Sequence, residues 1–365
     1  MVPATRWLVV AALAIGLASA PLVTQALPTH ETNISAARLA DRIQDAIDLG
    51  WSGEVRSLGS VQVPLTGSTF GGVARLLGEQ TDLRVWWRDA ENWRIDRLRA
   101  TGESDLVRDG DVTVRWNYED NRVNFTPYSP VRLPDDVDVV PSSLAARLLA
   151  DAQPQELSRL PARRVAGHNA AGLRLVPSDN RSTISKVDVW ADDSSGLPLR
   201  VEVYAEPAGG VPILSTELVS LSLERPSPAK VSFELSRSLD YSRGIALDAA
   251  AGANAFAPFV PPDSVAGLPR RGRAKDFGAV GVYGRGPTAV LAVPLRDSAA
   301  RGLRDQLRTS SSSHETGAGV ALEVGPLSVL LARAERGNFL LSGTVTPTTL
   351  ETAAADLTAG VVRTR

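Results

Sequence analysis

The chain has 365 residues, of which 43% are hydrophobic and 22% charged, a balance typical of a globular protein with enough apolar residues for a sizeable core. Its formal net charge of −2 gives no general attraction for nucleic acid, so no nucleic-acid partner is expected. The absence of cysteine excludes disulfides, thiol catalysis, thiolate metal sites and lipid attachment through a lipobox cysteine.

The first segment, residues 1–30, indicates export. Arg6 is the only charged residue before an apolar run over residues 7–23, and no further charge follows until Glu31. A charge, an apolar stretch and then small residues are typical of a secretory signal peptide, with a small-x-small cleavage site at residues 24–26. The run also approaches the ~17 residues that a membrane-spanning helix needs, so an uncleaved N-terminal membrane anchor is the alternative. Both alternatives place the rest of the chain outside the cytoplasm, in the periplasm or cell envelope.

An amphipathic helix is predicted over residues 35–50. Leu39, Ile43 and Ile47 recur at helical spacing, Ser35 can cap the start, and Gly50 can end the helix. A strand with breaks at two glycines is expected from Trp51 onward, followed by a short helix around residues 72–77. This first helix is expected to pack on a flat surface, such as a sheet.

Residues 83–126 predict an antiparallel meander. Strands are expected at 83–88 and 93–98, and Asp109-Gly110 is a strong hairpin signal before a segment that alternates with period two. One face of that segment should be buried and the other solvated. The expected buried face carries Val112, Val114, Trp116 and Tyr118, and the other carries Thr113, Arg115 and Asn117.

The remaining elements predict an α+β fold. A short helix at 142–151 precedes strands at 172–176, 186–190, 197–204 and 213–224, so the sheet order should be largely sequential. A Pro/Ala-rich linker is expected at 226–275. Beyond it, strands and helices alternate in two strand-strand-helix units, and residues 286–307 and 337–357 look distantly alike, a hint of duplication. The predicted organisation is a signal or anchor at 1–30, a β-sheet domain at 31–225, the linker, and a small α+β domain at 276–365.

The chain lacks the usual signatures of catalysis. Its three histidines, His30, His168 and His314, are not paired at helical spacing, which disfavours a metal site. There is no G-x-S-x-G elbow and no P-loop. Aspartate pairs fall at predicted turns, where Asp is favoured for backbone reasons. We therefore expect no enzyme activity, no cofactor and no metal.

Tryptophan is concentrated in the meander, where four of the seven residues of this type fall. They could fill an ordinary sheet core, or they could line a concave sheet that is open to an apolar guest. A shift of one residue in register would reverse which face they occupy. The residues predicted to line a ligand cavity are Val85, Trp87, Trp93, Ile95, Val112, Val114, Trp116, Phe125 and Val189.

Residues 165–224 resemble the MucB/RseB family of extracytoplasmic regulators. The resemblance is carried by Val165-Ala-Gly-His-Asn, by Lys186-Val-Asp-Val-Trp-Ala-Asp, by Gly196-Leu-Pro-Leu-Arg-Val-Glu-Val-Tyr and by Glu217-Leu-Val-Ser-Leu. Asp109-Gly110 followed by Arg115-Trp-Asn-Tyr also resembles the wider LolA/LolB lipoprotein-carrier group. The likeness covers roughly residues 40–225, and the C-terminal unit resembles that family's second domain only in order and size.

The resemblance implies a half-open, curved, LolA-like antiparallel sheet plugged by helices, with an apolar cavity for acyl chains. It also implies sigma-factor regulation, in which the protein binds a membrane anti-sigma factor and is released from it by lipid or lipoprotein signals. We therefore expect an envelope-stress regulator that senses lipid or lipoprotein. Two alternatives remain: a lipid or lipoprotein carrier with no signalling role, and an envelope enzyme whose site has no recognisable signature.

Overall fold

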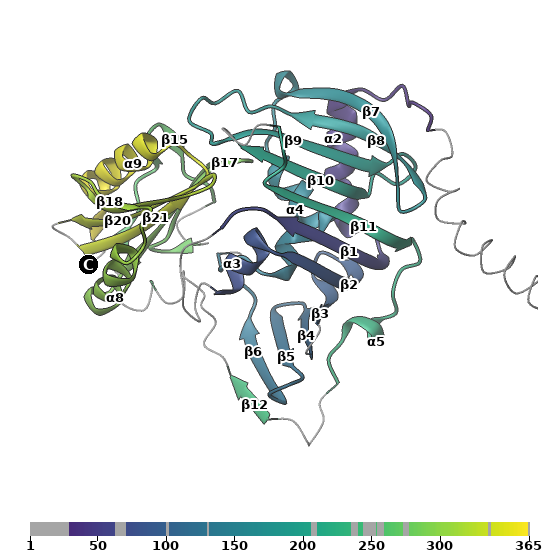
Figure 1. Cartoon of the computed structure of the whole chain (residues 1–365), viewed down its shortest axis with the longest axis horizontal. Coiled ribbons are helices and arrows are strands. Elements are labelled where there is room, and N and C mark those ends of the chain that lie inside the picture. Colours follow the sequence, from purple (N-terminus) through teal and green to yellow (C-terminus); the bar gives the residue numbers. More distant parts are fainter. Residues whose placement is uncertain are drawn as a thin grey trace, which may run out of the picture.

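The computed structural model describes residues 29–62, 71–99, 102–129, 131–205, 210–234, 240–243, 253, 259–272, 277–334 and 337–363. Nearly all of the predicted signal or anchor segment lies outside these ranges. Within them, no helix combines the length and apolar character that crossing a bilayer requires. The chain forms one large and one small β-sheet, each packed against helices (Figure 1).

The large sheet has twelve strands in the order β12-β6-β5-β4-β3-β2-β1-β11-β10-β9-β8-β7. Its described pairs are antiparallel except the β6–β12 pair, which is parallel. The predicted sequential order is found on either side of the β1–β11 pair, which joins the early strands to the later ones. The strands are β1 (Trp51–Gly59), β2 (Gln80–Asp89), β3 (Asn92–Arg99), β4 (Gly102–Asp109), β5 (Val112–Asn117), β6 (Arg122–Pro127), β7 (Leu157–Val165), β8 (His168–Leu175), β9 (Ile184–Asp192), β10 (Pro198–Ala205), β11 (Leu214–Ser222) and β12 (Asp240–Arg243).

The predicted hairpins form for local reasons. Asp109-Gly110 lies at the β4–β5 turn, where Gly110 has a φ of +59°, a value that glycine adopts without strain. Two strands of this sheet, β7 and β12, were not predicted, and β12 lies in the predicted linker. The sequence of β7 explains why it was missed. It contains Pro161 and several arginines and is interrupted by an irregularity between Leu160 and Arg163. Such a composition is tolerated because β7 lies at the sheet edge.

Short helical elements cover one face of the large sheet (Figure 1). They are α2 (Ala36–Asp45), η1 (Ala46–Asp48), η2 (Asp136–Val139) and α4 (Pro141–Leu148). The first predicted helix is present, since Ser35 Oγ accepts a hydrogen bond from the Arg38 N–H and so caps α2. Leu39 and Ile43 of α2 are buried in the core of the large sheet. Two further elements, α3 (Gly71–Gly78) and η3 (Pro154–Glu156), lie beside β1 and before β7.

The small sheet has six strands in the order β16-β17-β21-β20-β19-β18. Leu330 packs with Leu350 and Leu357, whereas its neighbour Leu331 packs with Ala300 and Leu307. Leu350 and Leu357 belong to α9, and Ala300 and Leu307 belong to α8. Because adjacent strand residues point to opposite faces, α8 and α9 cover opposite faces of this sheet (Figure 1). The elements are β16 (Gly281–Arg285), β17 (Thr288–Leu295), α8 (Asp297–Arg308), β18 (Ser313–Glu315), β19 (Gly319–Val324), β20 (Leu327–Ala334), β21 (Gly337–Gly343) and α9 (Pro347–Gly360).

The Pro/Ala-rich segment between the two sheets contains short elements. Its first part forms α5 (Pro228–Val231), which contacts β2, β3 and β4, and it later supplies the edge strand β12. Further along, it forms two-residue strands that pack beside the small sheet. These are β13 (Phe259–Val260), which pairs with β22 (Val362–Arg363), and β14 (Ser264–Val265), which pairs with β15 (Leu268–Pro269).

Candidate binding site

The two faces of the large sheet differ in chemistry. The face beneath α2 and α4, called here the helix-covered face, carries most of the main apolar cluster. The opposite face carries rows of ion pairs across neighbouring strands. Arg174 Nε lies 2.7 Å from Asp188 Oδ1, and Arg56 Nε lies 2.9 Å from Asp82 Oδ1. A binding site for an apolar molecule would therefore lie on the helix-covered face.

Five of the predicted cavity residues lie on the helix-covered face. They are buried in one cluster with the helices that cover it. Trp87 stacks between Trp51 and Trp93, with ring centroids 6.5 Å and 5.9 Å apart, and donates a hydrogen bond of 2.8 Å from Nε1 to the Ile47 carbonyl of η1. The five residues are Val85, Trp87, Trp93, Ile95 and Val189.

The other four predicted residues project from the opposite face. Residues directly paired across antiparallel strands share a face. Ile95 pairs with Leu106 and Leu106 pairs with Arg115, so Arg115, and not its neighbours in β5, lies on the helix-covered face. The nine predicted residues are thus not brought together. The four are Val112, Val114, Trp116 and Phe125.

Three of these four residues belong to a second, smaller cluster on the opposite face. Val114 is buried with Val107 and Val123, whereas Trp116 and Phe125 are partly buried and contact Phe233, which follows α5. Val112 is 40% exposed. Where the large sheet reaches β4–β6, the apolar side is therefore the opposite face, and the segment after α5 covers it. Contact of any of the nine with an acyl chain stays a prediction.

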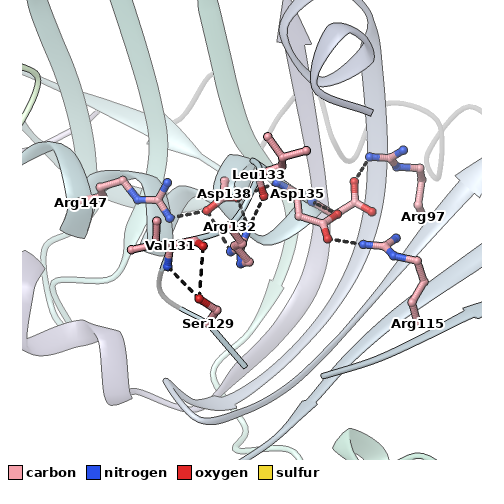
Figure 2. Close-up of polar contacts among 10 residues, drawn as sticks. Arg97, Arg115, Ser129, Val131, Arg132, Leu133, Asp135, Asp138 and Arg147 are labelled. Atoms are coloured by element: carbon pink, nitrogen blue, oxygen red, sulfur yellow. Dashed lines mark hydrogen bonds and ion pairs between the residues drawn. The ribbon is translucent and has the colours of Figure 1, made fainter. Parts of the chain in front are cut away.

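Polar residues occupy the helix-covered face at this end and hold an acidic turn, residues 135–140, against it (Figure 2). Arg115 pairs with Asp135, and Arg97 pairs with Asp136. Asp138 pairs with Arg147 and with Arg132, whose Nη1 lies 2.7 Å from Asp138 Oδ2. The acidic turn includes η2 and leads directly into α4.

The ion pairs set the charge state of the acidic turn. Burial opposes ionisation of Asp138, but Arg147 and Arg132 outweigh it and hold its pKa below the usual value. Burial, together with the charges of Arg99 and Arg115, lowers the pKa of Arg97 to about 10, against the opposing effect of Asp135. Arginine charge is therefore in excess around Arg97.

The apolar half of the acidic turn points into the core. Val137, Val139 and Val140 are buried in the main cluster, together with the stacked tryptophans. The Thr216 hydroxyl on β11 donates a hydrogen bond of 2.6 Å to the Val139 carbonyl. The acidic turn therefore fills the helix-covered face with valines while its aspartates bind arginines. Sequence analysis did not identify this turn; the available signal is the order Asp-Asp-Val-Asp-Val-Val at 135–140.

A cluster of three acidic residues has the spacing of a cation site. One oxygen from each of Asp96, Glu103 and Asp105 lies within 4.8 Å of the others, in a cluster that also contains Arg94. The guanidinium of Arg94 lies 2.7 Å from Asp96 Oδ1 and 2.6 Å from Asp105 Oδ2. Arg94 already pairs with both buried carboxylates, so the arrangement favours an ion-pair network.

Comparisons with known proteins return solved structures of low sequence identity. No family model matches the chain, and no curated protein matches it. The crystal structure of MucB in complex with MucA(peri) is similar at 16% identity and a TM-score of 0.49, covering 91% of this chain and 100% of that one. The MucA/MucB complex of Pseudomonas aeruginosa is similar at 15% identity and a TM-score of 0.48, covering 90% and 99%. A LolA-superfamily protein from Nitrosomonas europaea is similar over 55% of this chain and 98% of its own length, at 11% identity and a TM-score of 0.26.

The predicted fold class, a large antiparallel sheet with helices and a smaller α+β unit, is confirmed by the sheets themselves. The MucB and LolA names that the sequence resemblance predicted are the names these comparisons return.

Proposed function

We propose that this chain is an extracytoplasmic regulator of the sigma-factor envelope-stress type. It binds an anti-sigma factor and senses lipid or lipoprotein on the helix-covered face of its large sheet. The observation that carries this proposal is the way that face is filled. Two helices and the acidic turn cover it, and the turn contributes only three valines to the apolar cluster that also contains the stacked tryptophans. A short segment of this kind can be displaced by an acyl chain at lower cost than a second packed sheet.

Two further features support the proposal. The charge and hydropathy pattern of residues 1–30 favours export. Arg285 of the small sheet pairs with Glu156 of η3, which leads into β7 of the large sheet, so a change in one sheet can reach the other. We also propose that the chain is divided into a β-sheet domain at 31–225, a linker at 226–275 and a small α+β domain at 276–365.

The ligand is tested by native mass spectrometry with lipid extraction on the chain purified from its host envelope. We expect an acyl lipid to co-purify with the unaltered chain. Val137→Phe should exclude it, because a larger side chain fills the space beside the tryptophans. The matched control is Val112→Phe, which adds the same side chain on the opposite, exposed side and should retain the lipid. A chain that carries no lipid and binds none when it is added would contradict the proposal.

A carrier without a signalling role is the second candidate, and partner binding separates the two. A regulator should capture the extracytoplasmic part of an anti-sigma factor encoded beside it, and added lipid should release that partner. A carrier should bind lipid and show no such capture. The measurement is co-purification of the two proteins with and without lipid.

A further inference from the structure

The acidic turn has the chemistry of an anionic amphiphile. At one end its carboxylates pair with Arg97 and Arg115, and at the other Val137 and Val139 enter the apolar core. Charge and apolar surface are thus held within a few residues, at the junction between the polar and apolar parts of the helix-covered face. Whatever replaces this turn must satisfy both parts.

Arg97 keeps an unused N–H group although it pairs with Asp136. Arg97 is only 8% exposed, and its Nε is buried without a hydrogen-bond partner, as is Oδ2 of Asp136. Arg97 pairs with Asp136, and Asp135 also favours its charge, whereas the nearby charges of Arg75, Arg99 and Arg115 oppose it. A buried guanidinium with an unused N–H and like-charged neighbours favours additional negative charge.

We propose that Arg97 and Arg115 form an anion-binding site for the head group of an anionic amphiphile, and that the acidic turn is its internal occupant. The amphiphile's tail would take the place of Val137 and Val139 beside Trp87 and Trp93. This inference rests on the proposed function for the tail, and it adds the head group. A phosphate or carboxylate suits the site because either accepts paired hydrogen bonds from a guanidinium.

The head group is an amphiphile's and not a free anion's because of where the site lies. Arg97 is on β3, in the same strand and on the same face as Ile95 and Trp93, which belong to the apolar cluster. Side chains two residues apart on a strand are neighbours on one face. If the head group of a molecule binds Arg97, the part of the molecule next to the head group would therefore lie against Ile95.

The test compares three probes that share parts of one structure. Hexadecyl phosphate has both head and tail, hexadecanol has the tail alone, and inorganic phosphate has the head alone. Binding to the delipidated full chain is measured by titration calorimetry. We expect hexadecyl phosphate to bind at least about tenfold tighter than hexadecanol, the gain typical of a charge-assisted hydrogen bond. Inorganic phosphate should not bind measurably at millimolar concentration.

Variants separate the site from general electrostatics. Arg115→Gln should remove most of the preference for hexadecyl phosphate, whereas Arg56→Gln, on the opposite face, should keep it. Asp135→Asn removes part of the internal competitor and should tighten binding of hexadecyl phosphate several-fold. Asp82→Asn makes the same charge change in the Arg56 pair and should have no such effect. Circular dichroism checks that each variant is folded.

The outcomes point in different directions. Equal binding of hexadecyl phosphate and hexadecanol would overturn the head-group site and leave the apolar site intact. Binding of inorganic phosphate as tightly as hexadecyl phosphate would overturn the assignment to an amphiphile. If neither amphiphile binds, the proposed lipid site fails, and this inference fails with it. Equal effects of Asp135→Asn and Asp82→Asn would overturn the role of the turn as a competitor.

Discussion

At the scale of single residues, two buried carboxylates behave in opposite ways. Burial and the neighbouring charge of Asp96 raise the pKa of Asp105, on β4, to about 7, although Arg94 opposes the shift. Glu156 is held at a pKa of about 2 by hydrogen bonds from Arg285, against the opposing effect of burial. The difference lies in the neighbours, since Asp105 faces a second acid whereas Glu156 faces hydrogen-bond donors.

Asp105 should make the protein less stable at higher pH. Its pKa is higher in the folded chain than the usual value of about 3.9, so the folded state holds the proton longer and stability falls as pH rises from about 4 to about 7. Asp105→Asn removes this effect. We expect the variant to gain on the order of 1 kcal/mol over the unaltered chain between pH 5 and pH 8. Urea unfolding at both pH values measures it.

The control for this experiment is Asp82→Asn. Arg56 and Gln80 hold the pKa of Asp82 below its usual value, against the opposing effect of burial, so Asp82 is already ionised at pH 5. Its substitution should leave the change between pH 5 and pH 8 as it is in the unaltered chain. An Asp105→Asn variant that followed the unaltered chain in parallel would show that Asp105 does not titrate in this range.

At the scale of elements, the segment after α5 covers the β4–β6 end of the large sheet, where the apolar side is the face opposite the helices. Val231 is buried, and the Phe233 ring lies edge-to-face with Trp116 and Phe125, at centroid distances of 6.3 Å and 6.4 Å. The predicted linker thus begins as part of the core. It protects apolar side chains that the helices on the other face cannot reach.

Phe233→Ala should destabilise the chain and expose Trp116. We expect the free energy of unfolding to fall by about 2 kcal/mol, because a large apolar side chain leaves a cluster that it covers. Tryptophan emission should shift to longer wavelength, and the shift should be absent when Trp116→Phe is combined with it. Val112→Ala, at an exposed position on the same face, should change stability by less than about 0.5 kcal/mol. An unchanged emission spectrum would mean that Phe233 does not cover Trp116.

At the scale of the whole molecule, the two sheets are joined at several places. Arg285, at the end of β16, binds both oxygens of Glu156 at 2.7 Å and 2.8 Å. The backbone N–H of Thr183 donates to the Thr344 carbonyl at 3.1 Å, and an apolar cluster unites Val61 with α8 and β19. The carbonyl of Leu148, at the end of α4, lies 2.8 Å from the position that a Cβ on Gly286 would occupy. The helix that follows the acidic turn therefore abuts the small sheet.

Glu156→Gln should weaken this junction in a pH-dependent way. Because the folded pKa lies near 2 and the usual value is about 4.3, the stabilisation is present above pH 4 and is lost as pH falls toward 2. We expect a loss of about 2 kcal/mol at pH 7 and about half of that at pH 3, measured by urea unfolding. Arg285→Gln should cost a similar amount, and the double variant should cost little more. Equal losses at pH 7 and pH 3 would rule out the ionised pair as the cause.

The sequence by itself determined many of the strands and helices, because periodicity, caps and turn residues are local signals. The helix starting after Ser35 and the hairpin at Asp109-Gly110 follow from a few neighbouring residues. The edge strand β7 was missed because its arginines and Pro161 interrupt the alternation of apolar and polar residues that indicates a strand.

Only the tertiary structure decided which face each strand residue occupies. The alternation in β5 is the same on either assignment, and the pairing of Leu106 with Arg115 selects one of them. Likewise, the acidic residues at 135–138 acquire their role only when four arginines that lie far from one another in the chain converge on them. Local sequence cannot encode this convergence, since it depends on register and on the long-range meeting of β3, β5 and the start of α4.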